Sequence, residues 1–371
     1  MNMPVSVAPL FRPFRAGGLD LPNRIVMAPM TRWRAPGQYP GADIAAYYRR
    51  RAQDGVGLII TEGTTIDHPV ASHSERTPAF HGRALEGWQH VVTAVKAAGG
   101  RIVPQLWHVG AMRPPSYDAP NRDLPVSSPS GIAKPGGRPI ADPMTVAGIT
   151  AVIDAFVRAA LDARRLGFDG IEIHGAHGYI VDQFLWDALN RRTDAYGGGL
   201  DGRNRFAVEL VTAVRVAIGP DFPLILRLSQ WKQQDYAARL ATSPDELAAI
   251  VQPLAAAGVD VFHCSQRRWW EPEFPGSPLN LAGWVKRLTG RPVISVGSVG
   301  LGTPMSVTEH GADASVAFDP APLADALTRG DFDLIAVGRA LLADPQWCGK
   351  VRAGRFDDLV PYGRDVLDRL E

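Results

Sequence analysis

Short runs of apolar, β-favouring residues recur along the chain, and most end in a glycine or a polar residue. Nearly every position in these runs is apolar, which indicates strands that are covered on both faces. We predict strands at residues 24–29, 57–62, 102–107, 170–174, 224–229, 261–264, 293–296 and 334–337.

The segments between these runs have apolar residues at helical spacing. We predict helices at residues 42–54, 85–98, 149–166, 204–218 and 243–257. Thr150 is expected to open the third helix and Gly167 to end it. Ser243 and Glu246 form a typical helix start, and Gly258 is expected to end that helix.

Eight strands alternating with helices predict an α/β fold, a single (β/α)8 TIM barrel with long loops at the carboxyl-terminal face. Residues 1–371 are interpreted as one domain, since neither a linker nor a solenoid-type repeat is found. The long segments are residues 108–147, 265–280 and 299–331. A doubly wound sheet is the alternative, but its Gly-x-Gly-x-x-Gly turn is missing after the first strand.

Composition narrows the function classes. Hydrophobic residues make up 46% of the 371 positions, and the net charge of +1 gives no electrostatic reason to expect nucleic acid or an anionic membrane. The two cysteines, Cys264 and Cys348, favour a reducing compartment, and we expect a cytoplasmic protein. Two thiols are too few for a four-cysteine iron–sulfur cluster.

Residues 1–9 do not resemble a signal peptide, and no apolar stretch is long enough to span a bilayer.

Three proton-carrying side chains follow the fourth predicted strand, namely His174, His177 and Tyr179. Neutral imidazoles can donate to an oxygen that gains negative charge, and a tyrosine hydroxyl can deliver a proton. This set would suit reduction of a bond polarised by a carbonyl. Two alternatives stay open on this stretch alone: structural loop histidines, and a metal site that would also need Asp182 and Glu172 to turn inward.

The other strand ends add neutral donors, arginines and glycine turns. Gln105 suits a heterocyclic amide edge, and Arg227 would stabilise negative charge at the centre of such a ring. The glycine turns before Ser298 and Arg339 follow the last two strands, where barrels commonly bind phosphate. The residues at the strand ends include no serine or cysteine nucleophile that is paired with a base. They also include no cluster of carboxylates that could bind a metal, and we expect no metal. These features together indicate a flavin mononucleotide.

The chain resembles the Old Yellow Enzyme family of FMN-dependent ene-reductases over nearly its whole length. The matching motifs include Leu10-Phe11-Arg12-Pro13, Asn23 to Thr31, Gln105-Leu106-Trp107-His108, His174 to Tyr179, Gln183-Phe184-Leu185, Asn190 to Asp194, Tyr196-Gly197-Gly198, Asn204-Arg205-Phe206, Arg227-Leu228-Ser229 and Gly338-Arg339. The block from His174 to Arg205 is highly specific for this family.

The resemblance implies a role for each matching residue. His174 and His177 would bind the substrate oxygen, Tyr179 would donate the proton, and Trp107 would shape the substrate pocket. The implied cofactor-binding residues are Ala28, Pro29, Met30, Thr31, Gly63, Gln105, Arg227, Gly297, Ser298, Gly338 and Arg339. FMN would be held non-covalently, with NADPH or NADH as hydride donor.

The implied activity is reduction of activated C=C bonds in α,β-unsaturated carbonyl or nitro compounds, by hydride transfer from the flavin and protonation by Tyr179. Oxidative demethylation of an amine or betaine on the same barrel is an alternative, and a non-enzymatic flavin-binding or sensor protein is another. The expected partners are small-molecule activated alkenes, and neither nucleic acid nor a membrane is expected to bind. The protein is expected to be a monomer or a homo-oligomer. The chain departs from the family at Ala111, at Gln230-Trp231-Lys232, in the bulky loop 266–270 and in residues 299–331, which leaves the natural substrate open.

Overall fold

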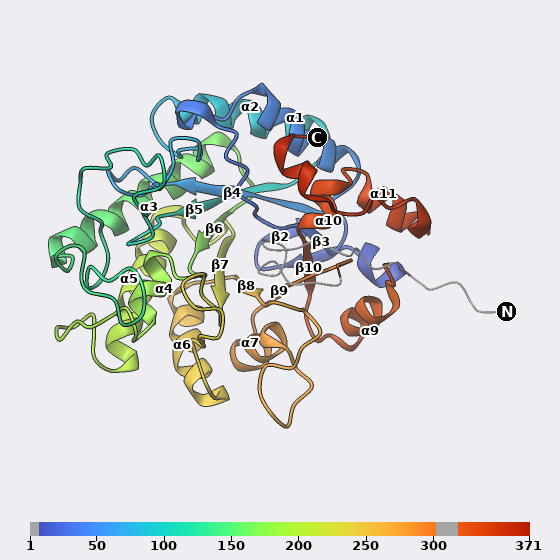
Figure 1. Cartoon of the computed structure of the whole chain (residues 1–371). Coiled ribbons are helices and arrows are strands. Elements are labelled where there is room, and N and C mark those ends of the chain that lie inside the picture. The colour runs from blue at the N-terminus through green and yellow to red at the C-terminus, as the bar shows by residue number, and fades with distance from the viewer. Residues whose placement is uncertain (1–6, 302–317) are drawn as a thin grey trace.

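The computed structural model describes residues 7–301 and 318–371, in which eight parallel strands close into a barrel (Figure 1). The barrel strands are β3 (Ile25–Met27), β4 (Leu58–Thr65), β5 (Ile102–Trp107), β6 (Ile171–His174), β7 (Leu224–Ser229), β8 (Val261–Ser265), β9 (Val293–Val296) and β10 (Leu334–Val337). The pairing of Ile335 in β10 with Ile25 in β3 closes the ring. The predicted TIM barrel is confirmed, and each predicted strand is a strand of this barrel.

Helices surround the barrel, as Figure 1 shows. They are α1 (Ala42–Gln53), α2 (Ala84–Ala97), α3 (Val146–Leu166), α4 (Ile180–Leu185), α5 (Leu200–Ile218), α6 (Pro244–Ala257), α7 (Leu281–Thr289), α9 (Ala321–Arg329), α10 (Arg339–Ala343) and α11 (Trp347–Arg352). Short 3-10 helices are η1 (Ala8–Phe11), η2 (Pro36–Gln38), η3 (Phe356–Asp358) and η4 (Arg364–Asp368). The five predicted helices correspond to α1, α2, α3, α5 and α6.

The predicted start of α6 is confirmed, because the Ser243 side chain accepts a hydrogen bond from the backbone nitrogen of Glu246. The predicted start of α3 was wrong. Thr145, rather than Thr150, caps this helix by accepting a hydrogen bond from the Gly148 nitrogen. The Thr150 hydroxyl lies inside the first turns and donates to the Val146 carbonyl. A glycine at position 148 hid this earlier start, since glycine is unfavourable inside a helix.

Other boundaries also differ from the prediction, among them the end of β3 at Met27 instead of residue 29 and those of α5, β4 and β8. Helix α5 begins at Leu200 instead of Asn204, directly after the glycines of residues 197–199. Strand β4 continues to Thr65, with a register shift against β5 between Ile60 and Gly63. Strand β8 continues one residue to Ser265, which pairs with Val296 of β9. This last residue brings a hydroxyl to the carboxyl end of the barrel.

The core has two layers. One layer lies between the helices and the outer faces of the strands, and the other fills the barrel interior. A hairpin that the sequence analysis missed, β1 (Phe14–Ala16) and β2 (Leu19–Leu21), packs its apolar residues into the inner layer. Its turn residue Gly17 has φ +57°, and a Cβ there would lie 2.8 Å from the Val261 side chain. The hairpin therefore covers the amino-terminal end, and the site lies at the opposite end.

The long predicted loops lie mostly where expected. Residues 108–145 connect β5 to α3 without a helix or strand, and residues 266–280 connect β8 to α7. Of the predicted segment 299–331, residues 302–317 lie outside the described residues, and the remainder contains α9. In the described part of the chain, none of the helices is long and apolar enough to cross a membrane.

Candidate active site

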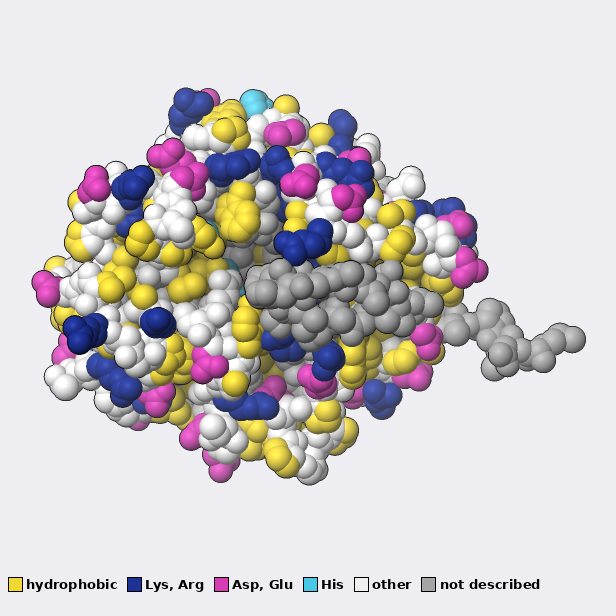
Figure 2. All heavy atoms as spheres, in the orientation of Figure 1, with side chains coloured by type: hydrophobic (Ala, Val, Ile, Leu, Met, Phe, Trp, Pro, Cys, Tyr) yellow, Lys and Arg dark blue, Asp and Glu magenta, His cyan; other side chains and the backbone are white. Residues whose placement is uncertain are grey.

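A cavity of about 440 Å³ lies at the carboxyl ends of the barrel strands. Figure 2 shows this face of the molecule, where hydrophobic side chains border a central hollow. The cavity brings together all of the predicted site residues except Gly63. They are Ala28, Pro29, Met30, Thr31, Gln105, Trp107, His174, His177, Tyr179, Arg227, Gly297, Ser298, Gly338 and Arg339.

Gly63 has a different place. It lies in β4 opposite Gln105, and a Cβ at this position would be 2.5 Å from Cε3 of Trp107. A larger residue would therefore push the Trp107 ring into the cavity. The structure places Gly63 behind the wall of the pocket rather than in its lining.

The turn that carries His174, His177 and Tyr179 is fixed by its own backbone. His177 has φ +64° and Gly178 has φ +80°, in the left-handed region that side chains rarely adopt. The His177 nitrogen donates to Ser229 Oγ at 2.9 Å, and the Gly178 nitrogen donates to Asp182 Oδ2 at 2.7 Å. These bonds from β7 and α4 offset the strain and hold the turn in one conformation.

The three side chains pack against one another in the lining of the cavity. The ring centroids of His174 and His177 lie 5.2 Å apart, and those of His174 and Tyr179 lie 4.9 Å apart. Trp107 packs edge-on against Tyr179 at 4.7 Å. The Tyr179 hydroxyl accepts a hydrogen bond from Gln233 Nε2 at 2.9 Å, so its own hydrogen can be donated elsewhere.

Burial keeps these groups uncharged. It lowers the pKa of His174 and of His177 well below the usual range, and the nearby Arg227 adds to the effect. Burial also raises the pKa of Tyr179, so the phenol keeps its proton. At neutral pH the site therefore offers two neutral imidazoles and one protonated phenol.

A buried network lies beneath the turn, inside the barrel. Glu172 accepts a hydrogen bond from Gln105 Nε2 at 2.7 Å, and its other oxygen lies 2.6 Å from Nδ1 of His263. Arg227 projects into the same region and is 6% exposed. Its Nε has no hydrogen-bond partner among the described residues. A buried guanidinium with an unused donor fits a ligand that carries negative charge.

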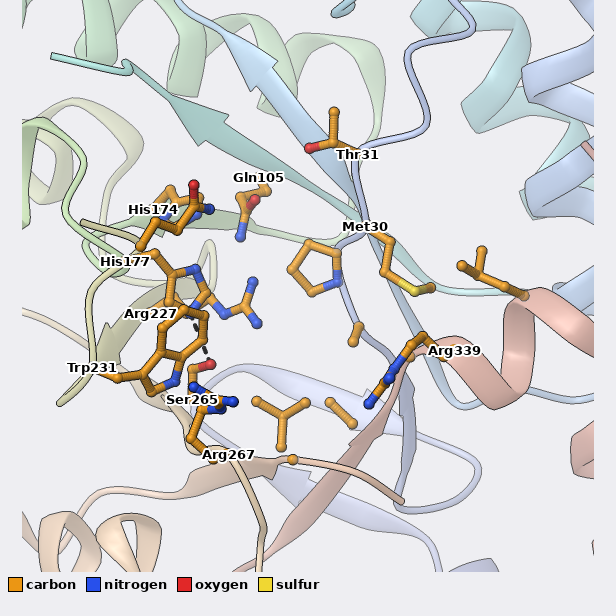
Figure 3. A pocket seen from close by; sticks show the side chains of 18 of the residues that line it. Met30, Thr31, Gln105, His174, His177, Arg227, Trp231, Ser265, Arg267 and Arg339 are labelled. Atoms are coloured by element: carbon orange, nitrogen blue, oxygen red, sulfur yellow. Dashed lines mark hydrogen bonds between the residues drawn. The ribbon is translucent and has the colours of Figure 1, made fainter. Parts of the chain in front are cut away.

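Arginines approach the cavity from two sides. Figure 3 shows Arg227 and Arg339 pointing into the hollow from opposite sides, with Met30 and Thr31 along another edge. Ser298 has φ +53°, and Gly297 has no room for a side chain because a Cβ would lie 2.7 Å from the Gln266 carbonyl oxygen. This region therefore exposes backbone and a guanidinium, which suits a phosphate group.

The sequence analysis missed one wall of the cavity. The Trp231 ring stacks on His177 with centroids 4.3 Å apart, and Trp231 also stacks on Tyr236 with centroids 5.5 Å apart. The Arg267 guanidinium lies 4.6 Å from the Tyr236 ring centroid. Trp231 and Arg267 stood out as departures from the family pattern, but nothing in the sequence indicated that they stack.

The two acids considered for a metal site are engaged elsewhere. Asp182 forms a fully buried ion pair with Lys232 at 2.6 Å, and Glu172 is bound to His263. Within residues 7–301 and 318–371, no group of three or more His, Cys, Asp or Glu side chains is placed to hold a metal ion. Both cysteines are free and buried.

The fold and the site define this chain as a (β/α)8 barrel with a donor-rich cavity at the carboxyl ends of its strands. The model of the NADH:flavin oxidoreductase / NADH oxidase family matches residues 9–358. The chain belongs to this family, which is the Old Yellow Enzyme family that the motifs indicated. The cofactor of this family is FMN.

Individual relatives agree with this placement. 12-Oxophytodienoate reductase 7 of Oryza sativa subsp. japonica is 43% identical over 225 residues, which cover 58% of this chain and 57% of that protein. Morphinone reductase in complex with tetrahydroNAD has a TM-score of 0.78 and 28% identity, covering 96% of this chain and 93% of that one. The old yellow enzyme homologue from Zymomonas mobilis has a TM-score of 0.78 and 26% identity, covering 96% of each chain. The chain thus spans little more than half the length of the curated relatives it matches first.

Proposed function

We propose that the protein reduces activated C=C bonds of α,β-unsaturated carbonyl or nitro compounds, with FMN as cofactor and NADPH or NADH as reductant. One observation carries this proposal. Two neutral imidazoles and a protonated phenol converge on a single cavity that also contains a buried arginine with an unused donor. Such a set can hold an oxygen that gains negative charge and protonate a neighbouring carbon.

FMN, when bound, supplies the hydride chemistry between the nicotinamide and the alkene. Arg227 would stabilise negative charge on the ring, and Gln105 would face its amide edge. Ser298 and Arg339 would hold the phosphate. The remaining contacts would come from the lining segment of residues 28–31 and from Gly297 and Gly338. Gly63 would contribute by leaving room for Trp107.

His174 and His177 would donate hydrogen bonds to the carbonyl or nitro oxygen of the substrate. Each ring is neutral and carries one ring hydrogen. Both rings can therefore stabilise the developing negative charge by hydrogen bonds, without transferring a proton to the oxygen. Tyr179 would deliver its hydroxyl proton to the carbon next to the carbonyl group. Gln233 keeps that hydroxyl oriented, and Trp107 packs against the Tyr179 ring.

Oxidative demethylation of an amine or betaine is the second candidate. The aromatic wall of Trp231 and Tyr236 could favour a cation. However, the guanidinium of Arg267 already lies over these two rings, at 5.7 Å from Trp231 and 4.6 Å from Tyr236. A second positive charge beside it would be repelled, which favours the reductase. A non-enzymatic flavin sensor would have no use for the His174, His177 and Tyr179 set.

The relatives support a reductase, since they are named for reduction of 12-oxophytodienoate and of morphinone. Residues 1–371 would form one catalytic domain, acting as a monomer or homo-oligomer. The two free cysteines support a reducing compartment such as the cytoplasm. Small activated alkenes, rather than nucleic acid or membrane lipid, would be its partners.

Steady-state turnover separates the two enzymatic candidates. The purified holoenzyme is supplied with cyclohexenone and NADPH or NADH without oxygen, and in parallel with a betaine and an electron acceptor. Formation of cyclohexanone in proportion to the coenzyme consumed is the expected result. Demethylation of the betaine, with cyclohexenone left unchanged, would overturn the proposal.

A further inference from the structure

His177 is held by two contacts that come from other parts of the barrel. Its Nε2 lies 2.8 Å from the hydroxyl of Ser265, the last residue of β8 (Figure 3). The face of its ring lies against Trp231, with an angle of 25° between the ring planes. Ser265 is 3% exposed and belongs to the β8–β9 pairing, so its hydroxyl is delivered by a rigid element. The ring of His177 can therefore neither flip nor tilt freely.

The hydrogen bond to Ser265 has two possible directions, because a neutral imidazole carries a single ring hydrogen. If Nε2 carried the hydrogen, Nδ1 would present a lone pair to the cavity. The Ser265 hydroxyl hydrogen would then lose the one hydrogen bond recorded for this side chain among the described residues. If the hydroxyl donates to Nε2, both groups are satisfied and Nδ1 carries the hydrogen. Burial favours the second arrangement, since an unsatisfied buried donor is costly.

His174 takes the opposite tautomer. Its Nδ1 accepts a hydrogen bond from the backbone nitrogen of Ala176 at 3.3 Å. The ring hydrogen of His174 must therefore be on Nε2. The turn sets the tautomer of His174 through its own backbone, but it offers no such partner to His177.

We propose that Ser265 is a positioning residue that fixes the Nδ1–H tautomer of His177, so that both imidazoles present a hydrogen to the substrate oxygen. This inference rests on the proposed reduction of activated alkenes, in which that oxygen is an acceptor only. With the other tautomer, a lone pair of His177 would face the lone pairs of the substrate. Ser265 thus converts a histidine that could accept or donate into a permanent donor.

The tautomer can be observed directly in the holoenzyme without substrate. Histidines labelled with ¹⁵N report by NMR which ring nitrogen carries the hydrogen, and a His177→Gln sample identifies the His177 signals among the nine histidines. We expect Nδ1–H in the parent and in Ser265→Thr, which keeps the hydroxyl. Ser265→Ala should show the Nε2–H form or a mixture. An unchanged Nδ1–H form in Ser265→Ala would overturn the inference.

Kinetics give a second readout. Ser265→Ala should lower kcat/KM for cyclohexenone roughly tenfold, the size of one neutral hydrogen bond, and Ser265→Thr should restore most of it. Reoxidation of the reduced enzyme by molecular oxygen needs no donor pair and should stay unchanged. Ser295→Ala is the matched control, because Ser295 is a fully buried serine on β9 whose hydroxyl accepts from Asn280 at 3.1 Å.

Ser295→Ala should leave cyclohexenone kinetics unchanged, and an equal loss in both alanine variants would assign the effect to stability and overturn the inference. Ser265→Cys has a weaker donor of similar size and should fall between the parent and Ser265→Ala. The two proposals fail separately. A parent enzyme that does not reduce enones refutes the proposed function, whereas the NMR tautomer decides the role of Ser265 by itself.

Discussion

Replacing Lys232 by methionine should be among the most destabilising single changes in the active-site region. Lys232 is fully buried, and its Nζ donates to Asp182 Oδ1 at 2.6 Å and to the Ser229 carbonyl at 3.1 Å. Asp182 is equally buried and also holds the Gly178 nitrogen of the His177–Tyr179 turn. Methionine fills a similar volume, so the change removes the charge and leaves the carboxylate alone in the protein interior.

The expected loss follows from this burial. Removing one partner of a buried ion pair typically costs about 3–5 kcal/mol. That is a large part of the roughly 5–15 kcal/mol that stabilises a typical domain. Urea unfolding of the holoenzyme at pH 7, followed by circular dichroism, measures the loss. Lys134→Met is the matched control, because Lys134 is exposed, and it should change the unfolding free energy by less than about 0.5 kcal/mol.

Two further observations test the cause. Without Lys232, burial keeps the pKa of Asp182 raised above its unfolded value, so the penalty is present at neutral pH and shrinks as pH falls through the raised pKa. Replacing both residues, as Lys232→Met with Asp182→Asn, should recover much of the stability, because the amide is uncharged and its oxygen can still accept from the Gly178 nitrogen. A loss below 1 kcal/mol for Lys232→Met would show that the pair is not a stabilising element and refute this reasoning.

The remaining predictions concern the cofactor, the substrate and pH. Arg227→Ala should weaken FMN affinity by at least about tenfold, because the flavin ring loses a charged donor. Fluorescence titration of the apoprotein measures this affinity. Unchanged FMN affinity and an unchanged midpoint potential of the flavin would make Arg227 purely structural. His177→Ala should weaken cyclohexenone binding by about 1–3 kcal/mol while coenzyme oxidation changes less, and equal cyclohexenone affinity in parent and variant would reject its role. Burial raises the pKa of Glu62 to about 7, so the native state binds a proton more readily than the unfolded state. Stability should therefore fall by up to about 3 kcal/mol as pH rises from 4.5 to 7, and Glu62→Gln should flatten this slope in urea titrations; equal slopes would assign the pH dependence to other groups.

Much of the architecture could be predicted because the barrel strands are buried on both faces. Strands β5, β7, β9 and β10 begin and end at the predicted residues, since each is a mostly apolar run bounded by polar, proline or glycine residues. The cavity could be predicted for a related reason. In a parallel barrel all strands end on one face, so residues far apart in sequence meet there.

The remaining features depend on contacts that leave no local pattern. The short β1–β2 hairpin contains only three residues in each strand. Lys232 stands in a polar loop sequence, which gives no sign that it is buried against Asp182. Ser265 lies 88 residues from His177, and only the closed barrel brings the two side chains together. Gly63 was assigned to the flavin by its motif, whereas its packing against Trp107 depends on the β4–β5 register.

The central claim is that His174 and His177 hold the substrate oxygen while Tyr179 protonates carbon. The most direct test is the rate at which anaerobically reduced Tyr179→Phe reduces cyclohexenone, compared with a nitroalkene, by stopped-flow absorbance. The cyclohexenone rate should fall on the order of 10²–10⁴-fold, because general acid catalysis is lost. The nitroalkene rate should fall much less, since its nitronate can leave and take a proton from water. Equal cyclohexenone rates in Tyr179→Phe and the parent would contradict the claim.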